Sequence, residues 1–157
     1  MILTERLTIE PLSYEGLCEY VRTRQGEINS DEAAKKFTDY TLIPMSVAPP
    51  KDHVFYTAWI GRCKGVDVVQ VGFLRPPNEH SVVEIWSHVN PEFRGLGYGT
   101  EAMRGLIDWV KDKPGVIFVG ASISPENTAS KHMIYKLGFS YATVVSEMEI
   151  FFLQVKF

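Results

Sequence analysis

The amino-acid sequence predicts an α/β (α+β) fold, in which a mixed, mainly antiparallel central sheet is flanked by helices. Three observations support this prediction. In the first half of the chain, short apolar runs are separated by glycine and proline turns, which is typical of hairpins. In the second half, strand and helix patterns alternate, which is typical of a parallel crossover. The length of 157 residues and the apolar content of 45% suit one domain over residues 1–157.

The N-terminal third is predicted to hold one strand and two helices. The strand covers Leu7–Pro11 and stops at its proline, after which Ser13 caps a helix that runs to about Thr23. A second helix is expected over Ser30–Tyr40. Thr41–Lys51 contains three prolines, so this segment is predicted to be a loop.

Three strands are expected next along the chain. The first two, Val54–Ile60 and Asp67–Arg75, are separated by a turn that contains Gly61 and Gly65. A Pro-Pro-Asn turn then leads into the third strand, Ser81–Val89. These connections place consecutive strands side by side in an antiparallel half of the sheet.

After these strands the apolar period changes to that of a helix. One buried stripe is expected from Ala102, Met103, Leu106, Ile107 and Val110. The helix covers Gly99–Lys111, a β-branched strand follows at Val116–Ala121, and a second helix covers Asn127–Leu137. Gly138 stands where a left-handed C-cap belongs.

The chain closes on a predicted hairpin of Phe139–Val145 and Glu147–Phe157. Its last strand is apolar and could pair or pack with a second copy of the chain. A homodimer is therefore one assembly to expect.

Composition and charge exclude several classes of function. The net charge is -3 and the basic residues form no run, which argues against a nucleic-acid partner. Cys18 and Cys63 lie far apart without a metal-binding motif, so no metal site is expected and both thiols are expected to be reduced. No stretch approaches the roughly 20 apolar residues that span a membrane, and the N-terminus has no apolar signal core. We therefore expect a cytoplasmic protein without a membrane partner.

A glycine-rich loop, Arg94–Thr100, lies between a predicted strand and the helix after it. Its alternating glycines, Gly95, Gly97 and Gly99, allow positive φ angles and a close approach of the backbone to a ligand. The following helix points its free N–H groups and the positive end of its dipole into the loop. Arg94 adds a positive charge, so the pattern predicts a phosphate or pyrophosphate site.

The spacing of the loop narrows the choice of phosphate ligand. A dinucleotide fingerprint needs G-x-G-x-x-G, but the third glycine of this loop comes one residue early. The acidic residue that such a fold carries after its next strand is also missing from the sequence, since Val119–Ser122 stands there. The sequence has no Gly-Lys-Ser/Thr triplet of a Walker A loop. A glycine turn without a ligand is the remaining alternative.

The stretch Glu84–Ala102 resembles motif A of the GNAT N-acetyltransferases, Q/R-x-x-G-x-G/A. Three further stretches resemble the ribosomal-protein N-terminal acetyltransferase (RimJ/RimL-like) branch of this family, namely Thr4–Leu12, Asn127–Ser130 and Lys136–Phe139. Together with motif A, these stretches lie at the start, in the middle and near the end of the chain, in the same order as in the family. The resemblance implies a GNAT-type mixed sheet and an acetyl-CoA-dependent N-acetyltransferase.

The resemblance also implies where acetyl-CoA binds. The pyrophosphate is expected on the backbone N–H groups of the glycine loop, and the pantetheine arm is expected to pair with the end of a strand, as an additional strand would. Asn127 is the family position that contacts the pantetheine region, although the same residue would also serve as a helix N-cap. The expected cofactor-binding residues are His88, Val89, Arg94, Gly95, Leu96, Gly97, Tyr98, Gly99, Thr100, Asn127 and Ser130.

The transfer requires a base, because an acceptor amine is mostly protonated at neutral pH. Glu84 is the candidate base and shares a strand face with Trp86 and His88, while a structural glutamate with an ion-pair partner is the alternative. His88 is the rival base, and a stacked or core histidine is the alternative for it. Backbone N–H groups at the end of this strand could stabilise an oxyanion.

The acid that protonates the departing thiolate is indicated less directly. Many family members carry a tyrosine four residues before the Gly-Phe of motif B, but Ile134 stands at this position. Tyr135 is one residue later, about 100° around the helix, so it is expected to be packed or exposed rather than catalytic. Ser130 is the candidate instead, because some relatives place a hydroxyl there near the sulfur. A solvent-side helix serine is the alternative.

The sequence thus predicts transfer of an acetyl group from acetyl-CoA to a primary amine by direct attack on the thioester. Two alternatives are a GNAT-fold module that binds acyl-CoA without turnover and an unrelated nucleotide-binding module. The acceptor, a protein N-terminus or a small-molecule amine, is expected to contact the segment Glu27–Lys51. Glu27, Asp31 and Glu32 in that segment could attract a cation or form a solvated helix face.

Overall fold

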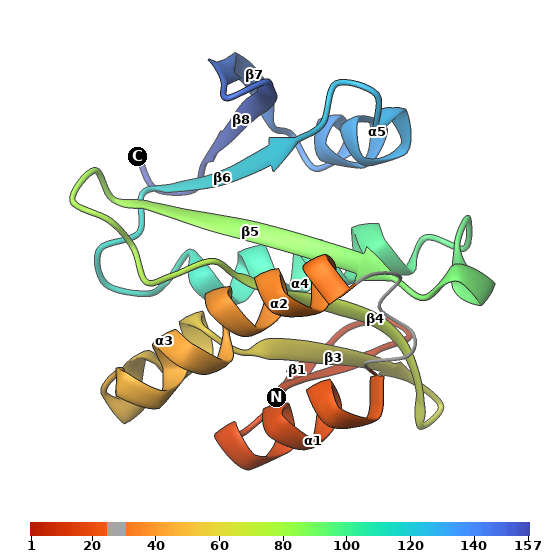
Figure 1. Cartoon of the computed structure of the whole chain (residues 1–157). Helices are drawn as coiled ribbons and strands as arrows, with labels where there is room; N and C mark the ends of the chain where they lie inside the picture. The colour runs from red at the N-terminus through yellow and green to blue at the C-terminus, as the bar shows by residue number, and fades with distance from the viewer. Residues whose placement is uncertain (25–30) are drawn as a thin grey trace.

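An eight-stranded sheet forms the centre of the computed structural model, which describes residues 1–24 and 31–157. The strand order is β1-β2-β3-β4-β5-β6-β8-β7, and neighbouring strands are antiparallel except for the parallel pair β5 and β6 (Figure 1). The strands are β1 (Ile2–Leu3), β2 (Thr8–Pro11), β3 (Ala58–Cys63), β4 (Val66–Phe73), β5 (Val82–Val89), β6 (Phe118–Ile123), β7 (Ser140–Val145) and β8 (Met148–Gln154). The predicted mixed, mainly antiparallel sheet is confirmed.

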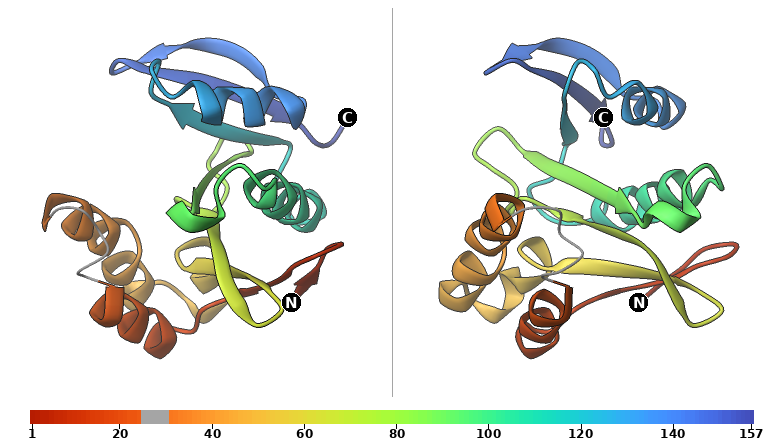
Figure 2. Two further views of the ribbon diagram at one scale, coloured as in Figure 1. Left: turned by 90° about the vertical axis from the view of Figure 1, so that its right-hand side faces the viewer. Right: turned by 45° about the vertical axis from the view of Figure 1, so that its right-hand side comes forward.

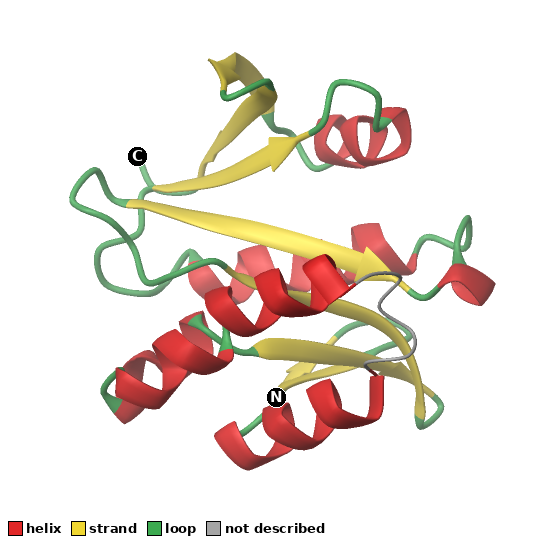
Figure 3. Cartoon of the chain, viewed as in Figure 1, coloured by secondary structure: helices red, strands yellow, loops and turns green. Residues whose placement is uncertain are grey.

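Helices cover both faces of this sheet (Figures 2 and 3). The N-terminal helices lie together on one face, whereas α4 lies on the opposite face with α5 beside it (Figure 2). The helices are α1 (Tyr14–Arg24), α2 (Asp31–Tyr40), α3 (Leu42–Val47), α4 (Tyr98–Val110) and α5 (Thr128–Lys136), with short 3-10 helices at Pro50–Phe55 and Pro91–Phe93. In the described ranges, the structure contains no helix with the length and apolar character to cross a membrane.

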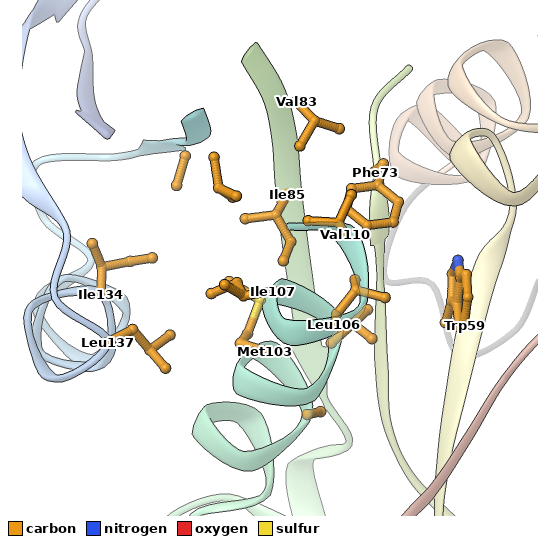
Figure 4. Packing of buried hydrophobic residues seen from close by; sticks show 14 of the residues in the cluster. Trp59, Phe73, Val83, Ile85, Met103, Leu106, Ile107, Val110, Ile134 and Leu137 are labelled. Carbon is orange, nitrogen blue, oxygen red and sulfur yellow. The ribbon is translucent and has the colours of Figure 1, made fainter. Parts of the chain in front are cut away.

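The main core lies between the sheet and α4. The predicted apolar stripe of α4 is buried along its length, and its side chains face β4 and β5 (Figure 4). Trp109, at the far end of α4, packs edge-on against Trp59 with ring centroids 4.8 Å apart. Ile134 and Leu137 of α5 extend the same core. Because each buried side chain of this size contributes about 1.5–3 kcal/mol, this packing fixes α4 against β5.

The prediction that Thr41–Lys51 is a loop is wrong. Leu42–Val47 forms α3, because Pro44 stands in the first turn, where a missing N–H leaves no helical hydrogen bond unmade. Met45 of this helix is buried in a second apolar cluster beneath α1. A second proline begins the 3-10 helix Pro50–Phe55.

The boundaries of β3 also differ from the prediction. The strand begins at Ala58 rather than Val54, because the preceding residues belong to the 3-10 helix. Gly61 lies inside β3 at an irregularity in the pairing with β4, not in the turn. The turn itself is made by Lys64 and Gly65, which have φ angles of 51° and 80°.

The C-terminal hairpin forms as predicted, but its place in the sheet changes how a second copy could pair. The last strand, β8, is paired on both edges, with β6 on one side and β7 on the other. Edge-to-edge pairing through the last strand is therefore excluded. The edge strand on this side of the sheet is β7, with exposed Tyr141, Val144 and Val145.

The predicted helix caps are confirmed. The Ser13 hydroxyl oxygen accepts a hydrogen bond from the Gly16 N–H at 3.1 Å at the start of α1. Gly138 follows α5 with a φ of 93°, the left-handed conformation expected for a C-cap. The two-residue strand β1 was not predicted, since Ile2 and Leu3 are too few to show a period.

Candidate active site

The facing edges of β5 and β6 form an opening in the sheet. The two strands pair only over Val82–Glu84 and Phe118–Gly120. Beyond these pairs, β5 remains paired with β4 and β6 remains paired with β8 to the end of each strand. The strands then diverge, with α5 after β6 and the glycine loop after β5 (Figure 1). The main-chain groups on these two diverging edges can pair with an extended ligand.

The glycine loop lies at the end of β5, where its backbone geometry suits an anion. Gly95 and Gly97 have φ angles of 77° and 84°, a conformation that glycine adopts without steric cost. Gly97 is the N-cap of α4 and makes no side-chain cap, and the Glu101 N–H donates to the Gly97 carbonyl oxygen at 3.1 Å. The N–H groups of the first turn, before Glu101, have no partner inside the helix. A diphosphate fits this set of donors and the positive end of the helix dipole.

Two glycines of the loop also allow close packing of the loop and of α4 against neighbouring side chains. A Cβ atom at Gly97 would lie 3.3 Å from the Arg6 Nη2 atom. A Cβ atom at Gly99 would lie 3.0 Å from the Val89 side chain and 3.2 Å from the Met133 sulfur. The third glycine is therefore needed for the contact of α4 with β5 and α5 rather than for a positive φ.

Arg6, in the N-terminal segment, contacts the glycine loop. The sequence alone did not predict this contact. The Arg6 Nη1 donates to the Leu96 carbonyl oxygen at 2.9 Å, and its Nε donates to the Glu101 carboxylate at 2.7 Å. The Arg6 guanidinium also lies 4.4 Å from the centre of the Tyr98 ring. No sequence signal links these residues, because Arg6 and Glu101 are 95 positions apart and meet only through the tertiary fold.

Glu84 lies at the last parallel pair, opposite Gly120, where β5 and β6 begin to diverge. Its side chain is 31% exposed, and its Oε1 atom lies 3.7 Å from the Arg75 Nη2 atom. The predicted alternation is confirmed, since Val83 and Ile85 are buried on the α4 side while Glu84 is half-buried on the other. The ion pair expected for a structural glutamate is therefore present, and the role of Glu84 as base stays a prediction.

The rival base and the loop arginine both lie near the end of β5. His88 is exposed, so a core histidine is excluded, and its role as base or cofactor contact stays a prediction. Arg94 is also exposed, and its Nε donates to the Val89 carbonyl oxygen at 3.2 Å. This contact ties the first residue of the glycine loop to the strand edge.

Helix α5 supplies the other side of the opening. The Asn127 Oδ1 atom accepts a hydrogen bond from the Ser130 N–H at 3.1 Å, which confirms the predicted N-cap. Ser130 is half-buried, whereas Ile134 is buried in the core. Tyr135 is 56% exposed, with its ring against Phe151, so the prediction that it is packed or exposed is confirmed. The cofactor and acid roles of Asn127 and Ser130 stay predictions.

The predicted acidic cluster cannot be assigned to this site. Glu27 lies outside the described residues, and so do the side chains of Asp31 and Glu32. Phe37, later in α2, is described and meets Trp86 of β5 edge-on, with ring centroids 6.2 Å apart. The α2 part of the segment expected to contact the acceptor therefore lies against the Glu84 face of β5.

Comparison with known proteins identifies the family. The family model that describes the acetyltransferase (GNAT) domain matches residues 6–140 of this chain. The uncharacterized N-acetyltransferase YjdG of Bacillus subtilis (strain 168) is 35% identical over 68 residues, an alignment that covers 43% of this chain and 40% of the length of that relative.

Solved structures share the fold over nearly the whole chain. The spermidine N-acetyltransferase of Vibrio cholerae is 14% identical, with a TM-score of 0.72 over 97% of this chain and 95% of that chain. RimL, a ribosomal L7/L12 alpha-N-protein acetyltransferase in complex with coenzyme A, is 10% identical, with a TM-score of 0.69 over 96% of this chain and 95% of that chain.

These likenesses confirm the predicted GNAT-type fold. The family match over residues 6–140 also confirms acetyl-CoA as the predicted cofactor. The chain belongs to the GNAT acetyltransferase family, whose members take an acetyl group from acetyl-CoA.

Proposed function

We propose that this chain is an N-acetyltransferase that moves the acetyl group of acetyl-CoA to a primary amine by direct attack of the amine on the thioester. The opening between β5 and β6 is the observation that carries the proposal. The N-terminus of α4, whose first N–H groups have no helical partner, lies at one end of the opening, and the Glu84 carboxylate lies at the other. From Glu84 to Val89, β5 is extended over about 17 Å, which the pantetheine arm would cover.

The residues of the opening would bind the cofactor along its length. The backbone N–H groups of Gly95–Thr100 would bind the diphosphate, and the edge of β5 at His88 and Val89 would pair with the pantetheine amides. Asn127 and Ser130 would contact it from α5. Bound there, acetyl-CoA supplies an acetyl group activated as a thioester.

Glu84, where β5 and β6 begin to diverge, and Ser130 of α5 would act on the protons. One oxygen of the Glu84 carboxylate would accept a proton from the acceptor ammonium, which leaves the amine nitrogen with a lone pair for attack. As the C–N bond forms and the C–S bond breaks, the nitrogen would release a second proton, which the departing thiolate would take up, and the Ser130 hydroxyl would donate a hydrogen bond to that sulfur. The partial exposure of Glu84 leaves it accessible to an incoming amine.

The acceptor would approach on the face of β5 that carries Glu84. The contact of Trp86 with Phe37 places α2 on this face, in agreement with the segment predicted to contact the acceptor. The named relatives act on two classes of amine, spermidine and a protein N-terminus, and both classes are acceptors to test.

A coenzyme A release assay tests the proposal directly. Purified protein is mixed with acetyl-CoA and with a panel of polyamines, amino acids and short peptides with free N-termini. We expect thiol release with at least one amine and loss of that release in Glu84→Gln, while thermal stabilisation by coenzyme A is retained in both proteins. If coenzyme A neither binds nor stabilises the parent protein, the proposal is rejected.

A second candidate is an acyl-CoA-binding module without turnover. Buried Ile134 at the usual tyrosine position and exposed Tyr135 favour this reading. It predicts stabilisation by acetyl-CoA without thiol release from any amine in the panel. The same assay therefore separates the two functions.

We infer that contact between copies of the chain uses β7, because this edge strand exposes three apolar side chains, whereas the opposite edge strand, β1, has two residues and exposes only Leu3 among them. The spermidine acetyltransferase of similar fold is dodecameric. Sedimentation of the parent protein and of Val144→Lys would test the inference. A parent dimer that persists unchanged in Val144→Lys would contradict it.

A further inference from the structure

Arg6 makes contacts with two parts of the phosphate loop region at once. Its Nη1 atom donates to the Leu96 carbonyl oxygen at 2.9 Å, and its Nε atom donates to the Glu101 carboxylate at 2.7 Å. The planar guanidinium holds these two donors in fixed directions within one plane, which a lysine could not reproduce. The N-terminal segment is thereby joined to the loop and to the first turns of α4.

Glu101 needs this partner because of where it lies. It is the fourth residue of α4, and a helical side chain leans toward the N-terminus of its helix, where the diphosphate is proposed to bind. Its side chain is only 15% exposed, so water screens the carboxylate charge poorly. An uncompensated carboxylate at this position would repel a diphosphate.

Several hydrogen bonds keep this carboxylate ionised. The Thr4 hydroxyl donates to Glu101 at 2.6 Å, and the Arg6 backbone N–H donates to it at 2.7 Å. Burial of the carboxyl group opposes ionisation, but the hydrogen bonds from Thr4 and Arg6 outweigh it and lower the pKa of Glu101 below its ordinary value. The same pairing raises the pKa of Arg6. Both groups are therefore charged at neutral pH.

The contact with Leu96 also sets the direction of a backbone donor. Leu96 and Gly97 share one planar trans peptide group, in which the carbonyl and the N–H point in opposite directions. With the Leu96 carbonyl bonded to Arg6, the Gly97 N–H points away from Arg6. The Gly97 N–H is thus a donor with a fixed direction on the side of the loop opposite Arg6.

We propose that Arg6 is a positioning residue for cofactor binding: it neutralises Glu101 and orients the Leu96–Gly97 peptide so that the loop accepts the diphosphate of acetyl-CoA. This inference rests on the proposed function of the loop. Arg6 itself acts through Glu101 and Leu96 and does not touch the cofactor.

Arg6→Met tests the inference, because methionine keeps much of the apolar stem and removes both donors. We expect the dissociation constant for coenzyme A, measured by calorimetry, to rise about tenfold. Arg62→Met is the matched control, since Arg62 makes a similar ion pair with Asp67 at 2.8 Å and is similarly exposed, but lies in β3. The control is expected to bind coenzyme A like the parent.

A substrate without a diphosphate separates positioning from damage to the fold. For Arg6→Met, we expect KM for acetyl-CoA to rise while kcat/KM for S-acetylpantetheine stays at the parent value. The double variant Arg6→Met/Glu101→Gln should recover part of the lost affinity, because it removes the uncompensated charge. If Arg6→Met does not fold, Arg6→Lys is measured instead. This variant should lose less affinity for coenzyme A, since lysine keeps the positive charge but does not provide the two fixed donors of the guanidinium.

Three results would overturn the inference. They are parent-like coenzyme A affinity in the Arg6 variant, an equal loss of kcat/KM with S-acetylpantetheine, and no recovery in the double variant. Gly97→Val distinguishes this outcome from failure of the proposed site. If Gly97→Val loses coenzyme A and Arg6→Met does not, the inference alone fails. If Gly97→Val also binds normally, the loop is not the site.

Discussion

The two ends of the opening differ in how tightly the protein fixes them. At the loop end, Arg6 bonds to Glu101 at 2.7 Å and to Leu96 at 2.9 Å. At the Glu84 end, the ion-pair partner Arg75 lies 3.7 Å away. A diphosphate is bound by backbone donors that must not move, whereas a base has to gain and lose a proton and to remain accessible. We therefore expect variants at the loop end to change the affinity for the cofactor and variants at the Glu84 end to change the rate of transfer.

Gly97→Val is expected to have the largest effect and to abolish coenzyme A binding. The new side chain would be strained at a φ of 84° and would lie 3.3 Å from the Arg6 Nη2 atom. Gly65→Val is the matched control, because Gly65 has a φ of 80° but no heavy atom within 4 Å of its added Cβ. Both variants should lose about 1–3 kcal/mol of stability from backbone strain, and only Gly97→Val should lose the ligand. Calorimetry and thermal unfolding measure the two effects.

Glu84→Gln is expected to lower kcat at neutral pH by about 10²- to 10⁴-fold, the usual contribution of a general base. KM for acetyl-CoA should change little, because Glu84 lies far from the loop along β5. Glu79→Gln serves as a control, since the Glu79 side chain is 86% exposed in the turn before β5. Equal rates for Glu84→Gln and the parent between pH 6 and 9 would remove Glu84 from the mechanism.

Ser130→Ala is expected to lower kcat about tenfold, if its hydroxyl stabilises the departing thiolate. Tyr135→Phe, which removes an exposed hydroxyl from the same helix, should leave kcat unchanged. Steady-state kinetics with acetyl-CoA and a working acceptor measures both variants. A tenfold loss in Tyr135→Phe and none in Ser130→Ala would reverse the assignment of the two hydroxyls.

Asn127→Ala is expected to have the smallest effect, a loss of about 1 kcal/mol of stability from the missing N-cap. Asn127→Ser should keep the cap and the stability, because a serine hydroxyl accepts the same hydrogen bond. Denaturant unfolding compares these two variants, and calorimetry compares their affinity for coenzyme A. Weaker binding by both would indicate that the amide contacts the pantetheine arm, and parent-like binding by both would leave Asn127 with the cap alone.

Strong periodicity made the centre of the fold predictable. The strand Ser81–Val89 and the helix Gly99–Lys111 are each found within about one residue of the predicted bounds. Their sequences combine one clear apolar face with a glycine loop between them. Helix α3 is not predictable from its prolines, because proline usually breaks a helix, whereas Pro44 in the first turn interrupts no hydrogen bond.

Only those parts of the site that lie within one short sequence motif could be predicted. The glycine loop follows from its own spacing, and its partners do not, since Arg6 and Glu101 meet only through the tertiary fold. The divergence of β5 and β6 beyond Glu84 is likewise invisible in the sequence, because a strand shows the same apolar pattern whether or not its edge is paired. The face of Glu84 could be predicted from period two, but its Arg75 partner could not.

A crystal structure of the protein soaked in acetyl-CoA tests the central claim most directly. We predict diphosphate oxygens at about 2.7–3.2 Å from backbone nitrogens of Gly95–Thr100, with the pantetheine arm along the edge of β5 that faces β6. A cofactor bound elsewhere, with this loop in contact only with solvent or with the protein's own side chains, would contradict it.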